Sequence, residues 1–417
     1  MVRRGIKLLL VTILFLMSCT VKAETENLAY HFDKAGISEQ VLTNYLKRAV
    51  TMSEFLTVNP FCNDGLQSDK SDDIRLIKNI DAKFIGRAIY RWGDEHAFNS
   101  PEFLGQAARL IKDVHRNDSE VIFQAAIFEN VTHEVDQINI PNWVFIALNM
   151  PVEKRNFSYA SMLNLKGKYV DHWEKGHSVP DITRYETQLW FTFLAGSYIN
   201  IGCEALHLGQ INLIGMEDAG LKFWVAWCGS IRKYAKKHAR RNWVLLDAHS
   251  TEGGTLIDDK SLLDFNSYPL RIKEDINSPM QGVLEKGYLD SFYGRSKACE
   301  TPTGWKCKAL PYLVELDNFG VSAKPGIANL SSHYIWGYDE ITWFYIQKED
   351  YRKAWLKYAN NWIQENDIAG HLQMPVTRII TLDNHIPVFK NFGNNKSSKC
   401  PDGMNLEETI KSIWYKQ

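Results

Sequence analysis

The sequence predicts an α/β fold, namely a (β/α)8 TIM barrel with an N-terminal lead-in and one long insertion after a strand. Apolar runs that end in polar residues alternate with amphipathic segments along the chain, as strands and helices do in such folds. One strand–helix–strand unit also has the spacing of a crossover between parallel strands. The strand candidates number roughly eight, which is what a closed barrel requires.

The N-terminus has the features of a signal peptide over residues 1–23. Basic residues precede an apolar segment from Leu8 to Met17, which is too short to cross a bilayer as a helix. Cleavage is expected either after Ala23 or directly before Cys19, and the segment ending at Cys19 resembles the lipobox of bacterial lipoproteins. We favour the second site, so that Cys19 would carry a lipid anchor to a membrane. The protein is therefore expected to be exported, either to the periplasm or to the cell surface.

The composition indicates a globular body without a polyelectrolyte partner. The chain has 417 residues, 45% of them hydrophobic, and a formal net charge of −1. No nucleic acid is predicted as a partner, because a nearly neutral chain lacks the required excess of cations. Among the cysteines, Cys299 and Cys307 flank a short turn and are the best candidates for a disulfide in an exported protein.

The chain divides into a lead-in over residues 24–80, a barrel over 81–390 with an insertion over 250–310, and a tail over 391–417. Helices are expected near Ser38–Leu56, Pro101–Val114, Leu221–Ala235 and Lys348–Glu365. The strand candidates are apolar or β-branched runs that end in polar residues. In chain order they are Phe84–Tyr90, Val121–Phe128, Phe157–Asn164, Tyr198–Cys203, Trp243–His249, Pro311–Phe319, Ser332–Gly337 and Leu372–Thr381.

The clearest unit runs from the Tyr198–Cys203 strand through a helix to the Trp243–His249 strand. Strands joined in this way lie parallel, and their carboxyl ends lie at the same edge. Glu204 follows the first strand and Asp247 lies near the end of the second, so the two should share that edge, where enzymes of this fold place their sites. The insertion leaves from the same edge and should cover the site.

Carboxylates, amides, imidazoles and aromatic residues gather at the predicted strand ends. Glu204, Glu315 and Glu340 are the candidate catalytic residues. The candidate substrate-binding residues are His207, Gln210, Asp247, His249, Asp317, Trp336 and Asp339. The chain also holds 13 Trp, whose flat apolar faces suit sugar rings.

This combination resembles a glycoside-hydrolase-type TIM barrel, without matching a particular family. The resemblance implies hydrolysis of an oligo- or polysaccharide, with one carboxylic acid protonating the leaving oxygen and a second carboxylate attacking or activating water. Glu204 would be the acid, and Glu315 or Glu340 its partner. The chain departs from many such enzymes at one position, since Cys203 precedes Glu204 where they carry Asn. No cofactor or metal is implied.

Other interpretations use the same residues. A surface lipoprotein without catalytic activity could bind glycans at the same strand ends. A metal-dependent hydrolase could use Glu204, His207, Asp247 and His249 as ligands, although no His-x-His pair or His-Glu-x-x-His segment is present. Glu204 could instead form an ion pair with Arg87 or Arg91, and Asp339 and Glu340 could begin a helix. The chain has no Gly-x-Ser-x-Gly elbow, phosphate loop or dinucleotide-binding glycine motif.

Overall fold

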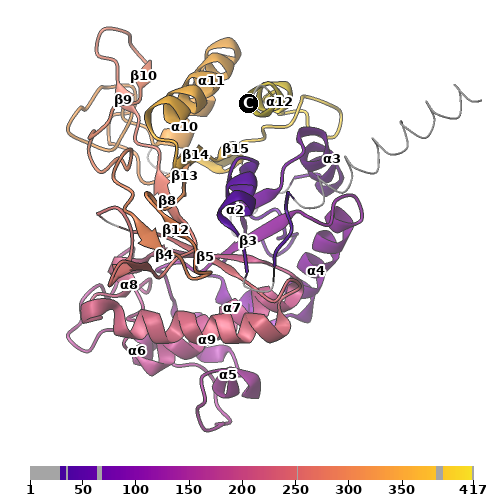
Figure 1. Cartoon of the computed structure of the whole chain (residues 1–417), viewed down its shortest axis with the longest axis vertical. Coiled ribbons are helices and arrows are strands. Elements are labelled where there is room, and N and C mark those ends of the chain that lie inside the picture. The colour runs from indigo at the N-terminus through magenta and orange to yellow at the C-terminus, as the bar shows by residue number, and fades with distance from the viewer. Residues whose placement is uncertain (1–28, 34–35, 63–67, 251, 382–387, 416–417) are drawn as a thin grey trace, which may run out of the picture.

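The computed structural model describes residues 29–33, 36–62, 68–250, 252–381 and 388–415, and its largest sheet is parallel. This sheet has six strands in the order β15-β1-β2-β3-β4-β5, and every neighbouring pair is parallel. The strand bounds are β1 Ala49–Met52, β2 Phe84–Ile89, β3 Ile122–Ala126, β4 Ala205–Gln210, β5 Leu245–His249 and β15 Met374–Thr377. Figure 1 shows how the strands follow one another along the chain.

A second parallel sheet has the order β14-β13-β8, with bounds Gly370–Leu372, Tyr312–Glu315 and Asn266–Pro269. Only Gln373 separates β14 from β15, so one stretch of chain runs from this sheet into the larger one. At the opposite edges, the Asp264 amide donates to the Leu246 carbonyl at 2.8 Å, but β5 and β8 are not paired among the described residues. The α/β fold is therefore confirmed, whereas the predicted closed (β/α)8 barrel is not.

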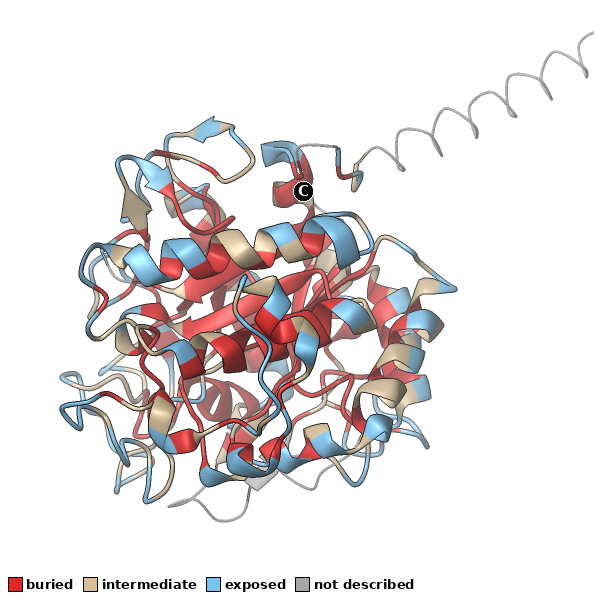
Figure 2. Ribbon diagram, turned by 90° about the horizontal axis from the view of Figure 1, so that it is seen from below, coloured by how far each residue is buried: buried red, intermediate tan, exposed pale blue. Residues whose placement is uncertain are grey.

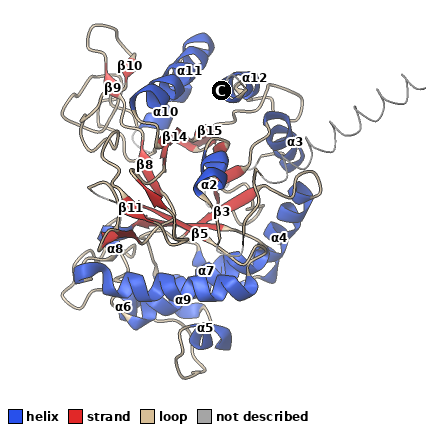
Figure 3. Ribbon diagram, in the orientation of Figure 1, coloured by secondary structure: helices blue, strands red, loops and turns tan. Residues whose placement is uncertain are grey.

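Most helices connect the strands and lie outside them, whereas α2 lies over the middle of the strands (Figure 3). The longer helices are α3 Lys70–Ile80, α4 Pro101–His115, α7 Tyr185–Ile201, α9 Lys222–His238 and α11 Glu349–Asn366. The shorter ones are α2 Glu39–Leu46, α5 Asn142–Ala147, α6 Tyr159–Met162, α8 Ile211–Ile214, α10 Glu340–Ile346, α12 Glu407–Trp414, and the 3-10 turns Glu95–Asn99, His133–Gln137 and Ala219–Leu221. The helices expected near residues 101–114, 221–235 and 348–365 are confirmed. No helix in the described ranges has both the length and the apolar character needed to cross a membrane.

The inner faces of the strands form two layers of opposite character. The first residues of the strands are apolar, and they pack against α2, which lies in front of the strands in Figure 1. This apolar layer consists of Ala49, Phe84, Ile122, Ala205, Leu245, Phe265 and Leu313, together with Val41, Leu42, Tyr45 and Leu46 of α2. Side chains two residues further along a strand return to the same face, and there the layer is polar. Figure 2 shows that the buried residues concentrate in these strands.

The Tyr198–Cys203 strand prediction is wrong. This segment is the end of helix α7, which is buried around most of its circumference, so its run of apolar residues has no helical period. Gly202 ends the helix in the left-handed conformation with φ of 110°, as helix-terminating glycines commonly do. The strand begins only at Ala205, so the parallel crossover is correct while its first strand lies later in the chain.

Other predicted boundaries also shift. The sheet begins inside the expected lead-in, since β1 pairs with both β2 and β15. The candidate strand Phe157–Asn164 contains the short helix α6, and Ser332–Gly337 contributes only an isolated bridge, Ile335 with Tyr338. The insertion over residues 250–310 is interrupted by β8, which belongs to the smaller parallel sheet. The signal peptide and Cys19 lie outside the described residues.

The remaining strands are short and form small sheets outside the parallel ones. They are β6 Leu256–Ile257, β7 Lys260–Ser261, β9 Lys273–Glu274, β10 Gly282–Val283, β11 Cys299–Glu300, β12 Lys306–Cys307, β16 Ile379–Thr381 and β17 Val388–Lys390. In the β11–β12 hairpin, Cys299 lies directly opposite Cys307, and their Sγ atoms are 3.7 Å apart as free thiols. The hydrogen bond from Cys299 lowers the pKa of Cys307 to about 7, so Cys307 is the more nucleophilic sulfur.

Oxidised glutathione should therefore convert this pair to a disulfide. The Cys307 thiolate attacks the disulfide of oxidised glutathione and displaces one glutathione as its thiolate. Cys299 then attacks the mixed disulfide and displaces the second glutathione. The first attack is fast because the pKa of the attacking thiol lies close to the ambient pH. Mass spectrometry should find a chain that is two hydrogens lighter than the reduced protein. Its digest should contain Cys299 and Cys307 joined by a disulfide. In a Cys299→Ser variant, Cys307 should retain glutathione instead. Persistent glutathione on Cys307 in the wild-type protein would contradict this expectation.

Candidate functional site

A pocket of about 550 Å³ lies at the carboxyl ends of the parallel strands. Most of its lining residues lie at the carboxyl ends of β1, β2, β3, β4, β5, β13 and β15 or directly after them, so nearly every strand of the two parallel sheets contributes. The lining consists of Ser53, Arg87, Tyr90, Trp92, Asp94, Phe128, Glu129, Trp173, His207, Gly209, Gln210, His249, Asp317, Asn318, Phe319, Gly320, Arg378 and Ile379. This is the edge at which the parallel arrangement predicts a site.

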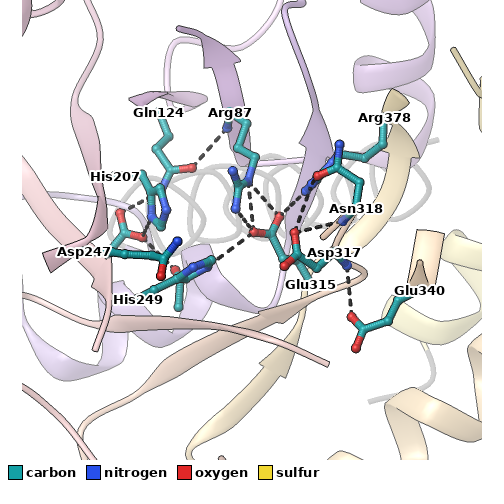
Figure 4. Close-up of polar contacts among 12 residues, drawn as sticks. Arg87, Gln124, His207, Asp247, His249, Glu315, Asp317, Asn318, Glu340 and Arg378 are labelled. Carbon is teal, nitrogen blue, oxygen red and sulfur yellow. Dashed lines mark hydrogen bonds and ion pairs between the residues drawn. The ribbon is translucent and has the colours of Figure 1, made fainter. Parts of the chain in front are cut away.

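Asp247 organises the polar layer beneath the pocket (Figure 4). Its carboxylate accepts hydrogen bonds from Gln124 Nε2 at 2.7 Å, His207 Nδ1 at 2.7 Å and Ser267 Oγ at 2.6 Å. His207 and Asp247 are also direct neighbours across β4 and β5. Burial lowers the pKa of His207 against the opposing effect of Asp247, so the imidazole is neutral at pH 7 with its proton on Nδ1.

Glu315 holds together the other half of the layer. Arg87 Nε donates to its two oxygens at 2.9 and 3.0 Å, and Arg378 Nη1 donates at 2.8 Å. His249 Nε2 lies 3.8 Å from the same carboxylate. Burial alone would raise the pKa of Glu315, but Arg87 and Arg378 hold it well below its ordinary value. Glu315 is therefore ionised beneath the pocket and does not line it.

A bulge in β2 turns Arg87 toward Glu315. Arg87 has a φ of 54°, and the register between β2 and β3 shifts between Ile85 and Ile89. The Arg87 backbone amide donates to Gln124 Oε1 at 3.0 Å, which replaces a ladder hydrogen bond lost at the bulge. Gln124 thereby joins the Asp247 group to the Glu315 group.

Asp317 lines the pocket two residues after Glu315. Its Oδ1 lies 3.4 Å from Arg378 Nη2 and accepts the Asn318 amide at 2.8 Å. Burial raises the pKa of Asp317, but the charges of Arg378, His249 and Arg87 together outweigh it and leave the pKa below its ordinary value. The pocket therefore holds one carboxylate that is ionised at neutral pH.

Glu129 is a second carboxylate in the pocket wall, and it was not among the candidate residues. Its oxygens accept from the Gln210 backbone amide at 3.0 Å and from Gln210 Nε2 at 2.9 Å. Gly209, with a φ of 55°, lies so close to Glu129 that a Cβ on it would collide with the carboxylate. The sequence does contain a signal for this residue, because Glu129 directly follows the predicted strand Val121–Phe128.

Aromatic side chains form much of the remaining wall. Trp92 and Trp173 meet edge to face, with ring centroids 5.0 Å apart, and Phe128 packs against Trp92 at 5.7 Å. Trp173 Nε1 donates to the Glu129 carbonyl at 2.8 Å, which ties the wall to the carboxylate. Trp173 comes from the long connection between β3 and α7, which has no periodic pattern that would place it here.

The structure brings together part of the predicted site. His207, Gln210, His249 and Asp317 line the pocket, and Asp247 and Glu315 lie directly beneath it. Trp336, Asp339 and Glu340 do not line it, so these three predictions are corrected. Trp336 donates from Nε1 to the Gln281 carbonyl at 3.0 Å and is buried in the loops.

Asp339 and Glu340 begin helix α10, as the alternative interpretation stated. Asp339 is the N-cap and accepts the Thr342 amide at 2.7 Å. Glu340 accepts the backbone amides of Arg271 at 2.8 Å and Asp317 at 3.0 Å, which fixes the loop that carries Asp317. Burial raises the pKa of Glu340 to about 7. Its role is to position that loop.

Glu204 is not part of the pocket, which corrects its assignment as general acid. It precedes β4 instead of following a strand, so it lies at the amino end, opposite the pocket. Its fully buried carboxylate accepts from Arg240 Nη2 and Arg241 Nε, each at 2.7 Å. An ion pair was the alternative expected for Glu204, although with other arginines. The alternative metal set fails for the same reason, because the Glu204 carboxylate is held by Arg240 and Arg241 and does not line the pocket with His207.

Within the described ranges, a different group could hold a metal ion. Single ligand atoms of Asp94, His96 and Glu134 all lie within 4.8 Å of one another. These residues are largely exposed, and His96 Nδ1 already contacts Glu134 at 2.9 Å. Asp94 also lines the pocket rim.

No family model and no curated protein matches this chain. Solved structures similar to it are glycoside hydrolases at low identity. A debranching enzyme from Nostoc punctiforme shares 11% identity and a TM-score of 0.33, over 54% of this chain and 52% of that chain. A β-L-arabinopyranosidase from Geobacillus stearothermophilus shares 10% identity and a TM-score of 0.31, over 54% of each chain. An α-galactosidase from Thermus thermophilus shares 12% identity and a TM-score of 0.34, over 91% of this chain and 64% of that chain.

The match thus spans about half the length of the first two of these structures, 52% and 54%. Likeness at these TM-scores defines neither the fold nor the activity of this chain.

The Glu204 cluster predicts a stability effect without a direct effect on the pocket. Glu204→Gln should lower the free energy of unfolding by about 3 kcal/mol, because Arg240 and Arg241 lose their buried partner. Urea unfolding measures this change. Glu102→Gln, which removes an exposed ion pair with Arg109, is the matched control and should leave stability nearly unchanged. Equal effects of the two substitutions would contradict this role for Glu204.

Proposed function

We propose that this protein is a glycoside hydrolase whose two parallel sheets are the arcs of one (β/α)8 barrel. The strands would follow one another as β1, β2, β3, β4, β5, β8, β13 and the continuous β14–β15 stretch, which pairs with β13 on one side and β1 on the other. The hydrogen bond from Asp264 to Leu246 supports contact between the remaining edges. The pocket would then occupy the mouth where enzymes of this fold place their sites.

The observation that carries the proposal is the pair of carboxylates, Glu129 and Asp317, in one pocket. Glu129 follows β3 and Asp317 follows β13, and in the proposed ring these strands are four positions apart in either direction. The two groups would therefore face each other across the mouth. Two carboxylates on opposite sides of a bound sugar are what hydrolysis of a glycosidic bond requires.

The surroundings of the two carboxylates favour different roles. Arg378 keeps Asp317 ionised, which suits the carboxylate that attacks the anomeric carbon or activates water. The side-chain amide of Gln210 donates to Glu129 through Nε2 and also has an acceptor oxygen. If Glu129 is protonated, its O–H group can donate to that oxygen, so the two side chains stay hydrogen-bonded. Glu129 would then donate its proton to the leaving oxygen.

The aromatic wall is consistent with a sugar ligand. Trp92, Phe128 and Trp173 present apolar ring surfaces beside the carboxylates, and Phe319 lines the pocket from the side of Asp317. The axial C–H groups of a sugar ring can pack on such surfaces while its hydroxyls reach the polar floor. Residues 1–23 still favour export, with the lipid anchor at Cys19 as part of the same proposal.

Asp317→Asn and Glu129→Gln should each lower turnover by roughly a thousandfold, because each removes one of the two reacting groups. Release of nitrophenol from a panel of nitrophenyl glycosides measures this loss. Asp113→Asn, which removes an exposed ion pair on α4, is the control and should leave turnover unchanged. Activity that survives both pocket substitutions would contradict these assignments. If the wild type binds glycans but hydrolyses none, the protein is the glycan-binding lipoprotein instead.

Gly209→Ala should lower turnover by about a hundredfold, since a Cβ there would push the Glu129 carboxylate away from its position. The change should appear in kcat measured on the best substrate of the same panel. Gly229→Ala is the control, because a Cβ at Gly229 in α9 meets no atom within 4 Å. Equal activity of the two variants would show that Glu129 needs no such placement.

A further inference from the structure

The cations of the pocket are already neutralised by the protein itself. Among the described residues that line it, the guanidinium groups belong to Arg87 and Arg378, and both donate to Glu315. Arg378 also donates to Asn318 Oδ1 at 2.5 Å. The part of the lining that the structure describes contains no lysine. An anionic group on a ligand would therefore have to displace an internal carboxylate to reach a cation.

Carboxylates outnumber the guanidinium groups around this space. Apart from Glu129, which is the proposed proton donor, Asp94 and Asp317 line the pocket and Glu315 lies beneath it. Figure 4 shows Glu315 between Arg87 and Arg378, with Asp317 beside it. A negatively charged group on a ligand would be repelled by these carboxylates. The repulsion acts at short range, and burial of the groups weakens its screening by salt.

The floor of the pocket also presents an acceptor that lacks a partner. His207 lines the pocket, is 2% exposed, and uses Nδ1 to donate to Asp247. Within the described structure its Nε2 is buried without a hydrogen-bond partner. In this tautomer Nε2 can only accept, so its natural partner is an O–H or N–H group of a ligand. A buried polar atom left unpaired is costly, which favours a ligand that satisfies it.

We propose that the floor of the pocket is a subsite for an uncharged sugar residue, one hydroxyl of which donates to His207 Nε2, and that it rejects sugars bearing a carboxylate or sulfate. The ligand class rests on the proposed function, whereas the charge selection follows from the pocket alone. A hydroxyl supplies the donor that His207 lacks. The carboxylate of a uronate, or a sulfate group, instead offers only acceptors and a negative charge, and among the described lining residues both guanidinium groups are already paired.

The test measures binding and turnover separately. Binding of glucose against glucuronate, and of galactose against galacturonate, is measured by NMR titration of the wild-type protein. Turnover is measured on the corresponding nitrophenyl glycosides. In each pair the neutral sugar should bind at least about tenfold more tightly, and where turnover occurs it should show the same order. A uronate that binds as well as its neutral counterpart, or no binding of either class, would overturn the proposal.

The His207 contact is tested with two variants and deoxy sugars. His207→Phe should bind the neutral sugar at least about tenfold more weakly, and His207→Gln, which restores an acceptor, should recover part of the loss. Removing one particular hydroxyl from the sugar should weaken binding to the wild type but not to His207→Phe. If the substitution acts only on the structure, each deoxy sugar should lose the same affinity, relative to the parent sugar, in His207→Phe as in the wild type. That result would overturn the proposed contact.

The two hypotheses fail in different ways. If the neutral sugars bind more tightly but none of their glycosides is hydrolysed, the proposed hydrolase activity is wrong and the subsite stands. If a uronide is hydrolysed as fast as its neutral counterpart, the hydrolase stands and the charge selection is wrong. His238→Phe, in the exposed end of α9, controls for general effects of replacing a histidine and should change neither measurement.

Discussion

The buried cluster of Glu315, Arg87 and Arg378 is the interaction on which the rest of the site depends. Removing three charges from water is costly, and the cost is offset only where the charges pair and their hydrogen bonds are complete. Completion requires the bulge in β2, the end of β13 and the segment after β15 to meet at one point. The same cluster keeps Asp317 ionised and, through Gln124, orders the neighbouring group around Asp247 and His207.

Such a polar cluster is stable because an apolar layer lies beneath it. The strands contribute alternate residues to the inner face, first apolar and then polar, and α2 covers the apolar end. Buried polar groups above that layer are nearly all paired with one another, so a few unpaired atoms stand out. His207 Nε2 is one of them. Because His207 lines the pocket, a bound ligand could supply the missing hydrogen bond.

The sequence predicted the alternation of strands and helices because apolar periodicity is local information. It located β2, β3, β5 and β13 and the carboxyl ends at which His249 and Asp317 lie, whereas β4, which carries His207, was placed too early in the chain. It failed at Glu204, because helix α7 is buried nearly all round and its apolar run looks like a strand. Glu129 and Trp173 were missed since their value depends on the pairing of distant segments, which no local pattern reveals. Bulges such as the one at Arg87 were equally invisible.

Because α2 covers the amino ends of the strands, substitutions at the two ends of the strands should have different effects. The described residues that pack the amino ends of the strands against α2 support the whole body, and they are not among those that line the pocket. The residues that line the pocket lie at the carboxyl ends of the strands and in the loops that follow them. Loop exchange at the carboxyl ends is therefore a practical route to altered selectivity in engineered variants, whereas the amino ends should be left intact as the scaffold.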